Sequence, residues 1–156
     1  MAISRRRNDE SYMRMALRLA EKAADCDEVP VGAVVVAANG EVLARAYNQV
    51  EMLKDATAHA EMIALTQAAS ALGDWRLTEA TLYVTKEPCA MCAGAMVNCR
   101  LGSLFYGCAD PRAGAAGSAL NILQFEGMLH KVEIAGGLCA DECLEQLQNF
   151  FRERRN

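Results

Sequence analysis

The sequence predicts an α/β fold in three α/β/α layers, with a five-stranded mixed sheet between helices. Two observations carry this prediction. Helical and strand patterns alternate through the middle of the 156-residue chain, which is typical of a layered α/β domain. An Asn39-Gly40 turn between two apolar runs indicates a hairpin, and a hairpin near the start makes the sheet mixed rather than parallel.

Four segments have the pattern of helices. Residues 11–24 place apolar side chains three and four positions apart, as an amphipathic helix does. Residues 58–72 are rich in Ala and Leu, which are strong helix formers. Residues 89–98 follow a proline, and proline is favoured where helices begin. Residues 140–154 predict a closing amphipathic helix.

Five shorter segments predict strands. The first is apolar and β-branched, which favours a buried strand. In chain order the predicted strands are residues 31–37, 41–47, 81–84, 104–106 and 131–135. Residues 109–118 are rich in Ala and Gly and predict a loop. Residues 1–8 predict a loose tail, followed by a single domain over residues 9–156.

Composition excludes several classes of protein. With 53% hydrophobic and 23% charged residues, the chain is too apolar to be disordered as a whole. Its longest apolar run is far shorter than the ~20 residues of a membrane span. Its basic start has no apolar stretch behind it, so we expect no secretory signal. Seven cysteines, an odd number, favour a reducing cytoplasm over a disulfide scaffold.

One cysteine pair has the spacing of metal ligands. Cys89 and Cys92 form a Cys-x-x-Cys at a predicted helix start, where free N–H groups favour thiolates. Such a pair is also compatible with a redox couple or with half of a four-cysteine zinc site. No second Cys-x-x-Cys is present. We interpret the remaining cysteines as packing residues; they are Cys26, Cys99, Cys108, Cys139 and Cys143.

A histidine upstream changes this interpretation. The chain has two histidines; we expect His130 to be structural. His59 with the two cysteines gives three zinc ligands and leaves one tetrahedral position open, as in catalytic zinc sites. Zn²⁺ with two thiolates and a neutral imidazole is electrically neutral, and its water can ionise near neutral pH. Glu61 follows His59 by two residues and suits a proton carrier rather than a ligand.

The His-x-Glu and Pro-Cys-x-x-Cys pair resembles the signature of zinc nucleobase deaminases. Further segments extend the likeness over roughly residues 10–155. The sequence resembles the bacterial tRNA-specific adenosine deaminases of the cytidine deaminase-like superfamily. The segments that carry this resemblance are 28–34, 57–61, 80–85, 89–96, 114–118 and 150–155.

The resemblance implies a cytoplasmic homodimer with one Zn²⁺ per subunit. The implied reaction converts adenosine to inosine, with release of ammonia, at the wobble position of a tRNA anticodon stem-loop, usually in an arginine tRNA. The family's zinc ligands fall on His59, Cys89 and Cys92, and its proton shuttle falls on Glu61.

The resemblance also implies substrate contacts. The base-contacting asparagine falls on Asn48, and we expect a backbone contact near Ala60. Anticodon-loop contacts are expected from Asp110 to Ser118, and from Phe151 and Arg152 at the end of the chain. Phe150 and Phe151 cannot both face the core of one helix, and an exposed Phe beside an Arg suits base stacking.

Three positions depart from the family pattern. Lys86 stands where Leu is usual, Ala56 where Pro is frequent, and Cys108 where Ala is common. None belongs to the predicted catalytic set. Lys86 and Cys108 border the predicted binding cleft, so they bear on substrate preference.

Three alternative functions remain open at this point. The nearest is a deaminase of the same fold that acts on free guanine, cytosine or a nucleotide. The others are a catalytically silent RNA-binding subunit and a structural zinc or thiol module.

The net charge of −4 argues at first sight against an RNA partner. Residues 1–7 nevertheless carry three Arg, and residues 152–156 carry three Arg against one Glu. We therefore expect a small footprint on one stem-loop rather than extensive phosphate binding.

Overall fold

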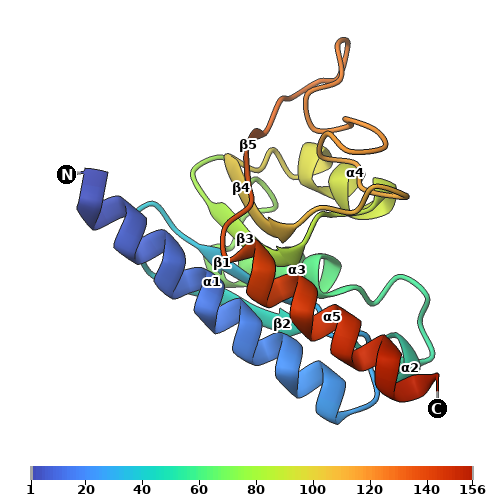
Figure 1. Cartoon of the computed structure of the whole chain (residues 1–156). Helices are drawn as coiled ribbons and strands as arrows, with labels where there is room; N and C mark the ends of the chain where they lie inside the picture. The colour runs from blue at the N-terminus through green and yellow to red at the C-terminus, as the bar shows by residue number, and fades with distance from the viewer. Residues whose placement is uncertain (1, 156) are drawn as a thin grey trace.

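The computed structural model describes the backbone of residues 2–155 and the side chains of residues 8–155. Helices and strands alternate along the chain (Figure 1). In order they are α1 (Ala2–Asp25), β1 (Gly32–Val36), β2 (Val42–Tyr47), α2 (Val50–Leu53), α3 (Ala60–Leu72), β3 (Thr81–Lys86), α4 (Ala90–Asn98), β4 (Ser103–Cys108), β5 (Glu133–Gly136) and α5 (Ala140–Arg154).

The strands form the predicted five-stranded mixed sheet, in the order β2-β1-β3-β4-β5. Strand β1 is antiparallel to both of its neighbours, β2 and β3. Strands β3, β4 and β5 run parallel to one another. Helix α4 connects β3 to β4, as a crossover between parallel strands requires.

Helices cover both faces of the sheet, so the prediction of three layers is confirmed. Helices α1 and α5 lie side by side across one face, and α3 and α4 cover the other (Figure 1). The central strand β1 is buried along its whole length. Its Ala33 and Val35 pack toward α3, whereas Val34 and Val36 pack toward α1. Because both faces of this strand are covered, its sequence is a continuous apolar run and does not alternate with polar residues.

The start of α1 corrects one prediction. The sequence predicts a loose tail over residues 1–8 and a helix from residue 11, whereas α1 begins at Ala2. Residues 2–8 include Ala and three Arg, which are good helix formers. They extend toward the N-terminus the same helix whose later residues pack in the core. Met1 lies outside the described residues. The single-domain boundary at residue 9 stays a prediction.

A short helix that the sequence does not indicate follows β2. Helix α2 has four residues and no buried side chain. The buried Glu28 carboxylate accepts hydrogen bonds from the backbone N–H groups of Glu51 and Met52, at 2.9 and 2.8 Å. These bonds satisfy donors that an isolated turn of this length would leave open.

The topology gathers loop residues at one edge of the sheet. Lys86 at the end of β3 is paired with Cys108 at the end of β4. Gly32, which begins the antiparallel β1, is paired with Tyr47, which ends β2. The segments that follow β2, β3 and β4 therefore leave the sheet together, and ligands of open α/β sheets bind at such an edge.

Among the described residues, no helix has the length and apolar character needed to cross a bilayer.

Gly32 sets how closely α1 approaches the sheet. A Cβ atom at this position would lie 1.9 Å from the Ala16 carbonyl oxygen and 2.7 Å from the Ala20 nitrogen. Both atoms belong to the helix backbone and cannot move aside alone. The absence of a side chain at Gly32 therefore permits the tight contact between α1 and β1.

Gly32→Ala is expected to lower the free energy of unfolding by about 2 kcal/mol, since overpacking at a backbone contact forces the helix away from the sheet. Chemical denaturation measures this change. Gly94→Ala is the matched control, because a Cβ at Gly94 meets nothing within 4 Å and alanine stabilises a helix interior by about 0.5–1 kcal/mol. Equal stability of the two variants would contradict the close contact.

Candidate active site

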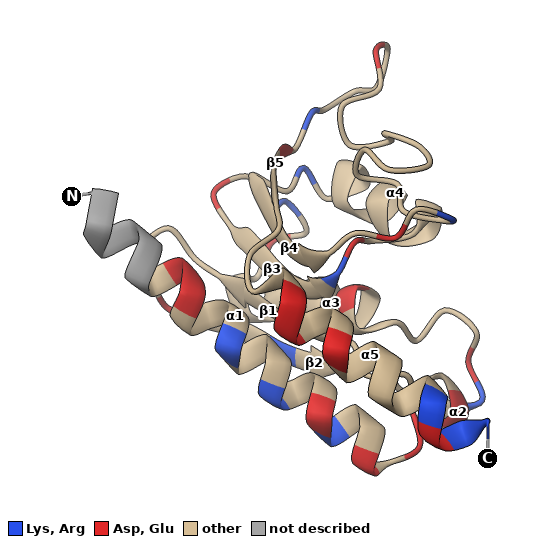
Figure 2. Ribbon diagram, viewed as in Figure 1, with Lys and Arg blue, Asp and Glu red and all other residues tan. Residues whose placement is uncertain are grey.

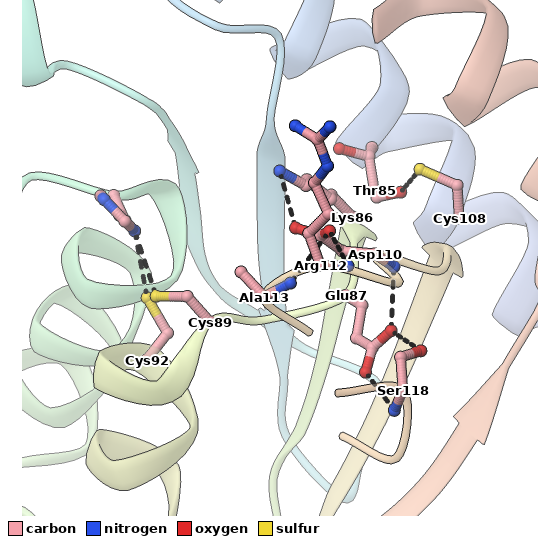
Figure 3. Close-up of polar contacts among 11 residues, drawn as sticks. Thr85, Lys86, Glu87, Cys89, Cys92, Cys108, Asp110, Arg112, Ala113 and Ser118 are labelled. Carbon is pink, nitrogen blue, oxygen red and sulfur yellow. Dashed lines mark hydrogen bonds and ion pairs between the residues drawn. The ribbon is translucent and has the colours of Figure 1, made fainter. Parts of the chain in front are cut away.

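The three predicted metal ligands lie together. The Nδ1 atom of His59 is 3.6 Å from the Sγ atom of Cys89 and 3.5 Å from that of Cys92 (Figure 3). Their ligand atoms all lie within 4.8 Å of one another, and among the described side chains they are the group suited to hold a metal ion.

The helix starts explain this arrangement. His59 is the N-cap of α3 and Cys89 is the N-cap of α4, and neither side chain caps its own helix. Two side chains at helix starts are therefore free to face each other, and Cys92 joins them from the first turn of α4. Helix N-termini also favour the thiolate form of cysteine.

The donor atoms fit a zinc ion. Ligand bonds of about 2.0–2.1 Å to nitrogen and 2.3 Å to sulfur, at a tetrahedral angle, place nitrogen and sulfur about 3.5 Å apart. The two nitrogen–sulfur distances of 3.5 and 3.6 Å match this separation. One imidazole and two thiols make a soft donor set with a free fourth position, as in catalytic zinc sites.

The protonation of the two thiols differs. Hydrogen bonds with Cys92 and His59 lower the pKa of Cys89 to about 3. The hydrogen bond with Cys89, together with burial, raises the pKa of Cys92. The interaction with Cys89 also raises the pKa of His59. The short distances between the three groups cause these shifts, and a metal ion would bind the deprotonated thiols and the neutral imidazole.

Two further predicted residues lie beside the ligands. Glu61, in the first turn of α3, is 4% exposed, and burial raises its pKa to about 7. Asn48 is 9% exposed, and its Oδ1 atom accepts a hydrogen bond from the Ala60 N–H at 2.8 Å. The Asn48 amide thus caps α3 from outside the helix. The Ala60 N–H, for which a substrate contact is predicted, is thus already bonded to Asn48.

These residues open into a cavity of about 680 Å³ at the edge of the sheet. Its lining includes the predicted residues Asn48, His59, Glu61, Cys89 and Asp110. Phe151 and Arg152 lie in a neighbouring groove. The structure thus brings the predicted catalytic residues together and places two of the predicted RNA-contacting residues just outside.

The chain matches proteins of known activity. The family model of MafB19-like deaminases matches residues 7–155. The chain belongs to this deaminase family. The tRNA-specific adenosine deaminase of Bacillus subtilis (strain 168) is 48% identical over 94% of this chain and 91% of its own length. The resemblance to tRNA-specific adenosine deaminases is confirmed, and the chain is an enzyme that deaminates by hydrolysis.

Solved structures agree with this assignment. A structure described in studies of A-to-I editing by tRNA:A34 deaminases has a TM-score of 0.84 and 42% identity, and the match covers 88% of this chain and 99% of that one. Guanine deaminase from Bacillus subtilis has a TM-score of 0.62 and 35% identity, over 70% of this chain and 69% of that one. The cytidine deaminase-like fold predicted from the sequence is confirmed.

A buried carboxylate organises one wall of the deaminase's cavity. Glu87 is 2% exposed, and it accepts hydrogen bonds from the backbone N–H groups of Asp110, Ala116 and Ser118 at 3.0 to 3.1 Å. Figure 3 shows the bonds from Asp110 and Ser118. The hydroxyl of Ser118 also donates to it. Burial opposes ionisation of Glu87, but these hydrogen bonds outweigh burial and lower its pKa.

Gly114 completes this arrangement. A Cβ atom there would lie 2.3 Å from the Glu87 carboxyl carbon and 2.5 Å from the Asp110 carbonyl oxygen. The predicted loop over residues 109–118 therefore wraps closely around one carboxylate. The hydroxyl of Ser118 points into the protein rather than toward a substrate, so the contact predicted for Ser118 stays a prediction.

Sequence reasoning missed the roles of Glu87 and Glu28. Both are buried carboxylates that bind backbone N–H groups of distant segments. Their partners lie 23 to 31 positions away along the chain, so no local spacing indicates them. The one available signal is that Glu87 stands directly before Pro88-Cys89, inside the deaminase signature.

At the end of α5 only one of two adjacent Phe side chains faces the core, as the sequence predicts. Phe150 is 6% exposed, whereas Phe151 is 44% exposed. The guanidinium of Arg154 lies 3.5 Å from the centre of the Phe150 ring and binds the Asp27 carboxylate at 2.6 Å. The last turn is therefore attached to the segment after α1, and Phe151 faces outward.

Two of the remaining cysteines are packing residues. Cys108 and Cys143 are buried between the sheet and α5, as the packing interpretation predicts, whereas Cys26 is exposed. None of the five other cysteines belongs to the group of possible metal ligands among the described side chains. His130 donates from Nε2 to the Leu101 carbonyl at 2.7 Å, a contact that agrees with the structural role predicted for it.

Glu87→Gln is expected to loosen the loop over residues 109–118, because an amide offers one acceptor oxygen and turns an NH₂ group toward N–H donors. Hydrogen exchange at the Ala116 and Ser118 amides should accelerate at least about tenfold, the loss expected for hydrogen bonds to a charged group. Glu79→Gln, at an exposed carboxylate, is the control. Unchanged protection in both variants would disprove the organising role.

Proposed function

We propose that this deaminase converts adenosine to inosine at the wobble position of a tRNA anticodon, with one Zn²⁺ held by His59, Cys89 and Cys92. Water is consumed and ammonia is released. The observation that carries the proposal is the open three-ligand site beside the buried Glu61, in a chain 48% identical to a tRNA-specific adenosine deaminase.

The residues around the cavity have distinct roles in this reaction. Zn²⁺ bound at the three ligands supplies Lewis-acid activation of water. Glu61 takes up the first proton that water loses and delivers it to N1 of adenine. It then takes up the proton of the new hydroxyl group on C6 and passes it to the amino group, which leaves as ammonia while C6–O becomes the carbonyl of inosine. Glu61 suits this exchange because it lines the cavity two residues from His59.

Asn48 fits a base-binding role. Its Oδ1 atom is fixed by the Ala60 N–H at 2.8 Å, so the orientation of the amide is set before a substrate arrives. A fixed amide on the cavity wall can hydrogen-bond an adenine that is splayed out of the loop. Asp110 lines the same cavity, and Phe151 and Arg152 are assigned to the neighbouring nucleotides.

A guanine deaminase activity is the second candidate, because a guanine deaminase matches with 35% identity. That structure matches 70% of this chain with a TM-score of 0.62, whereas the structure from the studies of tRNA:A34 deaminases matches 88% with a TM-score of 0.84. The exposed Phe151 beside Arg152 also favours a nucleic acid over a free base, since stacking and phosphate attraction serve neighbouring nucleotides.

Further features of the proposal rest on the resemblance. We assign an arginine tRNA as the substrate, a homodimer as the active assembly and the cytoplasm as its location. Apolar side chains between β4 and β5 support an interface, because Leu120, Phe125 and Leu129 are all more than half exposed, and exposed apolar residues can mark such surfaces.

The substrate assignment is tested by incubating the protein with tRNA transcripts and with free guanine, cytosine and adenosine. Sequencing of the tRNA should show A-to-I conversion at the wobble position alone, and the release of ammonia from the free compounds should be negligible. Ammonia release from guanine with no inosine in tRNA would establish the second candidate instead.

Glu61→Gln is expected to reduce inosine formation at least about 10²-fold, within the usual contribution of a general acid–base group, while one Zn²⁺ per chain is retained. His59→Ala is the comparison variant, and it should lose both metal and activity because a ligand is missing. Elemental analysis and a single-turnover assay measure the two quantities. Substantial turnover by the Glu61 variant would contradict the proton-transfer role.

A further inference from the structure

Lys86 stands at the boundary between two cavities. One is the catalytic cavity described above. The other, here called the outer groove, has a volume of about 700 Å³ and lies between residues 108–111 and α5. The two cavities share two residues in their linings, Lys86 and Asp110. The Nζ atom of Lys86 binds the Asp110 carboxylate at 3.2 Å, so this ion pair lies between the catalytic cavity and the outer groove.

The two cavities differ in charge. Six carboxyl side chains line the catalytic cavity: Asp27, Glu28, Glu51, Glu61, Glu87 and Asp110. Its two cations, Lys86 and Arg154, are each already paired with a carboxylate. A neutral base can enter this cavity, whereas an anionic phosphate would meet repulsion.

The outer groove has the opposite balance. It is lined by Lys86, Arg152 and Arg155, with Asp110 as its carboxylate. Basic residues gather at this end of α5 (Figure 2). Phe151, also in the lining, presents an exposed ring. Cations beside an exposed aromatic ring are the combination that binds single-stranded nucleic acid.

Lys86 can leave this ion pair without leaving the Asp110 carboxylate unpaired. Asp110 holds Lys86 through Oδ2, while its Oδ1 accepts hydrogen bonds from the N–H groups of Arg112 and Ala113 at 3.0 and 3.2 Å. If Lys86 leaves, Asp110 keeps two donors and its place in the loop. Lys86 is about one-third exposed, so its flexible side chain has room to turn toward the groove.

We infer that Lys86 is a positioning residue that leaves Asp110 when substrate binds and contacts the phosphate joining the target nucleotide to its neighbour. The neighbouring base then lies against Phe151 in the outer groove. This inference rests on the proposed function, because it requires a polynucleotide substrate with the target adenine in the catalytic cavity.

The first test compares Lys86→Met, Lys86→Arg and Arg76→Met on an anticodon stem-loop RNA. Lys86→Met should raise KM about tenfold with kcat within about twofold, and should reduce the slope of log affinity against log salt by about 0.7–0.9, the value of one phosphate contact. Lys86→Arg keeps the charge and should restore KM. Arg76→Met breaks an exposed ion pair far from both cavities and should change neither quantity.

The second test identifies the phosphate. Stem-loops with one neutral methylphosphonate, placed either before or after the target nucleotide, are assayed with wild type and Lys86→Met. At one of the two linkages the neutral group should weaken binding to wild type about tenfold and binding to Lys86→Met hardly at all. The inference would be overturned if, at both linkages, the neutral group weakened binding to Lys86→Met by the same factor as binding to wild type. A change in kcat alone in Lys86→Met would also overturn it.

These outcomes separate the inference from the proposed function. If wild type forms no inosine in the stem-loop, the proposed function fails and the inference fails with it. If wild type is active and Lys86→Met has an unchanged KM and salt slope, the inference alone is wrong.

Discussion

The need to satisfy buried polar groups shapes the edge of the sheet that carries the candidate site. The buried polar side chains among residues 8–155 are those of Glu28, Asn48, Glu61, Thr85 and Glu87, and all lie at or beside this edge. Unpaired, each would destabilise the fold. Four of them instead accept hydrogen bonds from backbone N–H groups of other segments, so each one attaches a loop or the start of a helix or strand to the site.

Much of the fold and the metal site follows from local patterns, and the rest does not. Strand and helix periodicity predicts the sheet and its covering helices, and the resemblance to the deaminase signature identifies His59, Cys89 and Cys92 as the ligand group that the structure brings together. The Glu87 network has no such pattern, because its donors are backbone groups of a loop more than 20 positions away. The early start of α1 was missed because residues 2–8 lack apolar periodicity but retain helix propensity.

The proposed catalytic groups and the proposed substrate contacts occupy different kinds of structure. His59, Glu61, Cys89 and Cys92 lie at or just inside helix starts packed on the sheet. Lys86 ends strand β3, Asp110 lies in the loop after β4, and Phe151 is on the exposed side of the last helix. Under the proposed function, packed elements hold the chemistry and peripheral ones contact the substrate, so related deaminases can share the first while differing in the second.

The predicted metal ligands are attached to the hydrophobic core through the two helices that carry them. The core on the α3 and α4 side of the sheet is continuous, and the fully buried Cys92 belongs to it. The distances between the ligand atoms therefore depend on how α3 and α4 pack on the sheet. A substitution that shifts either helix would change those distances without replacing a ligand, so damage to the site can begin far from it.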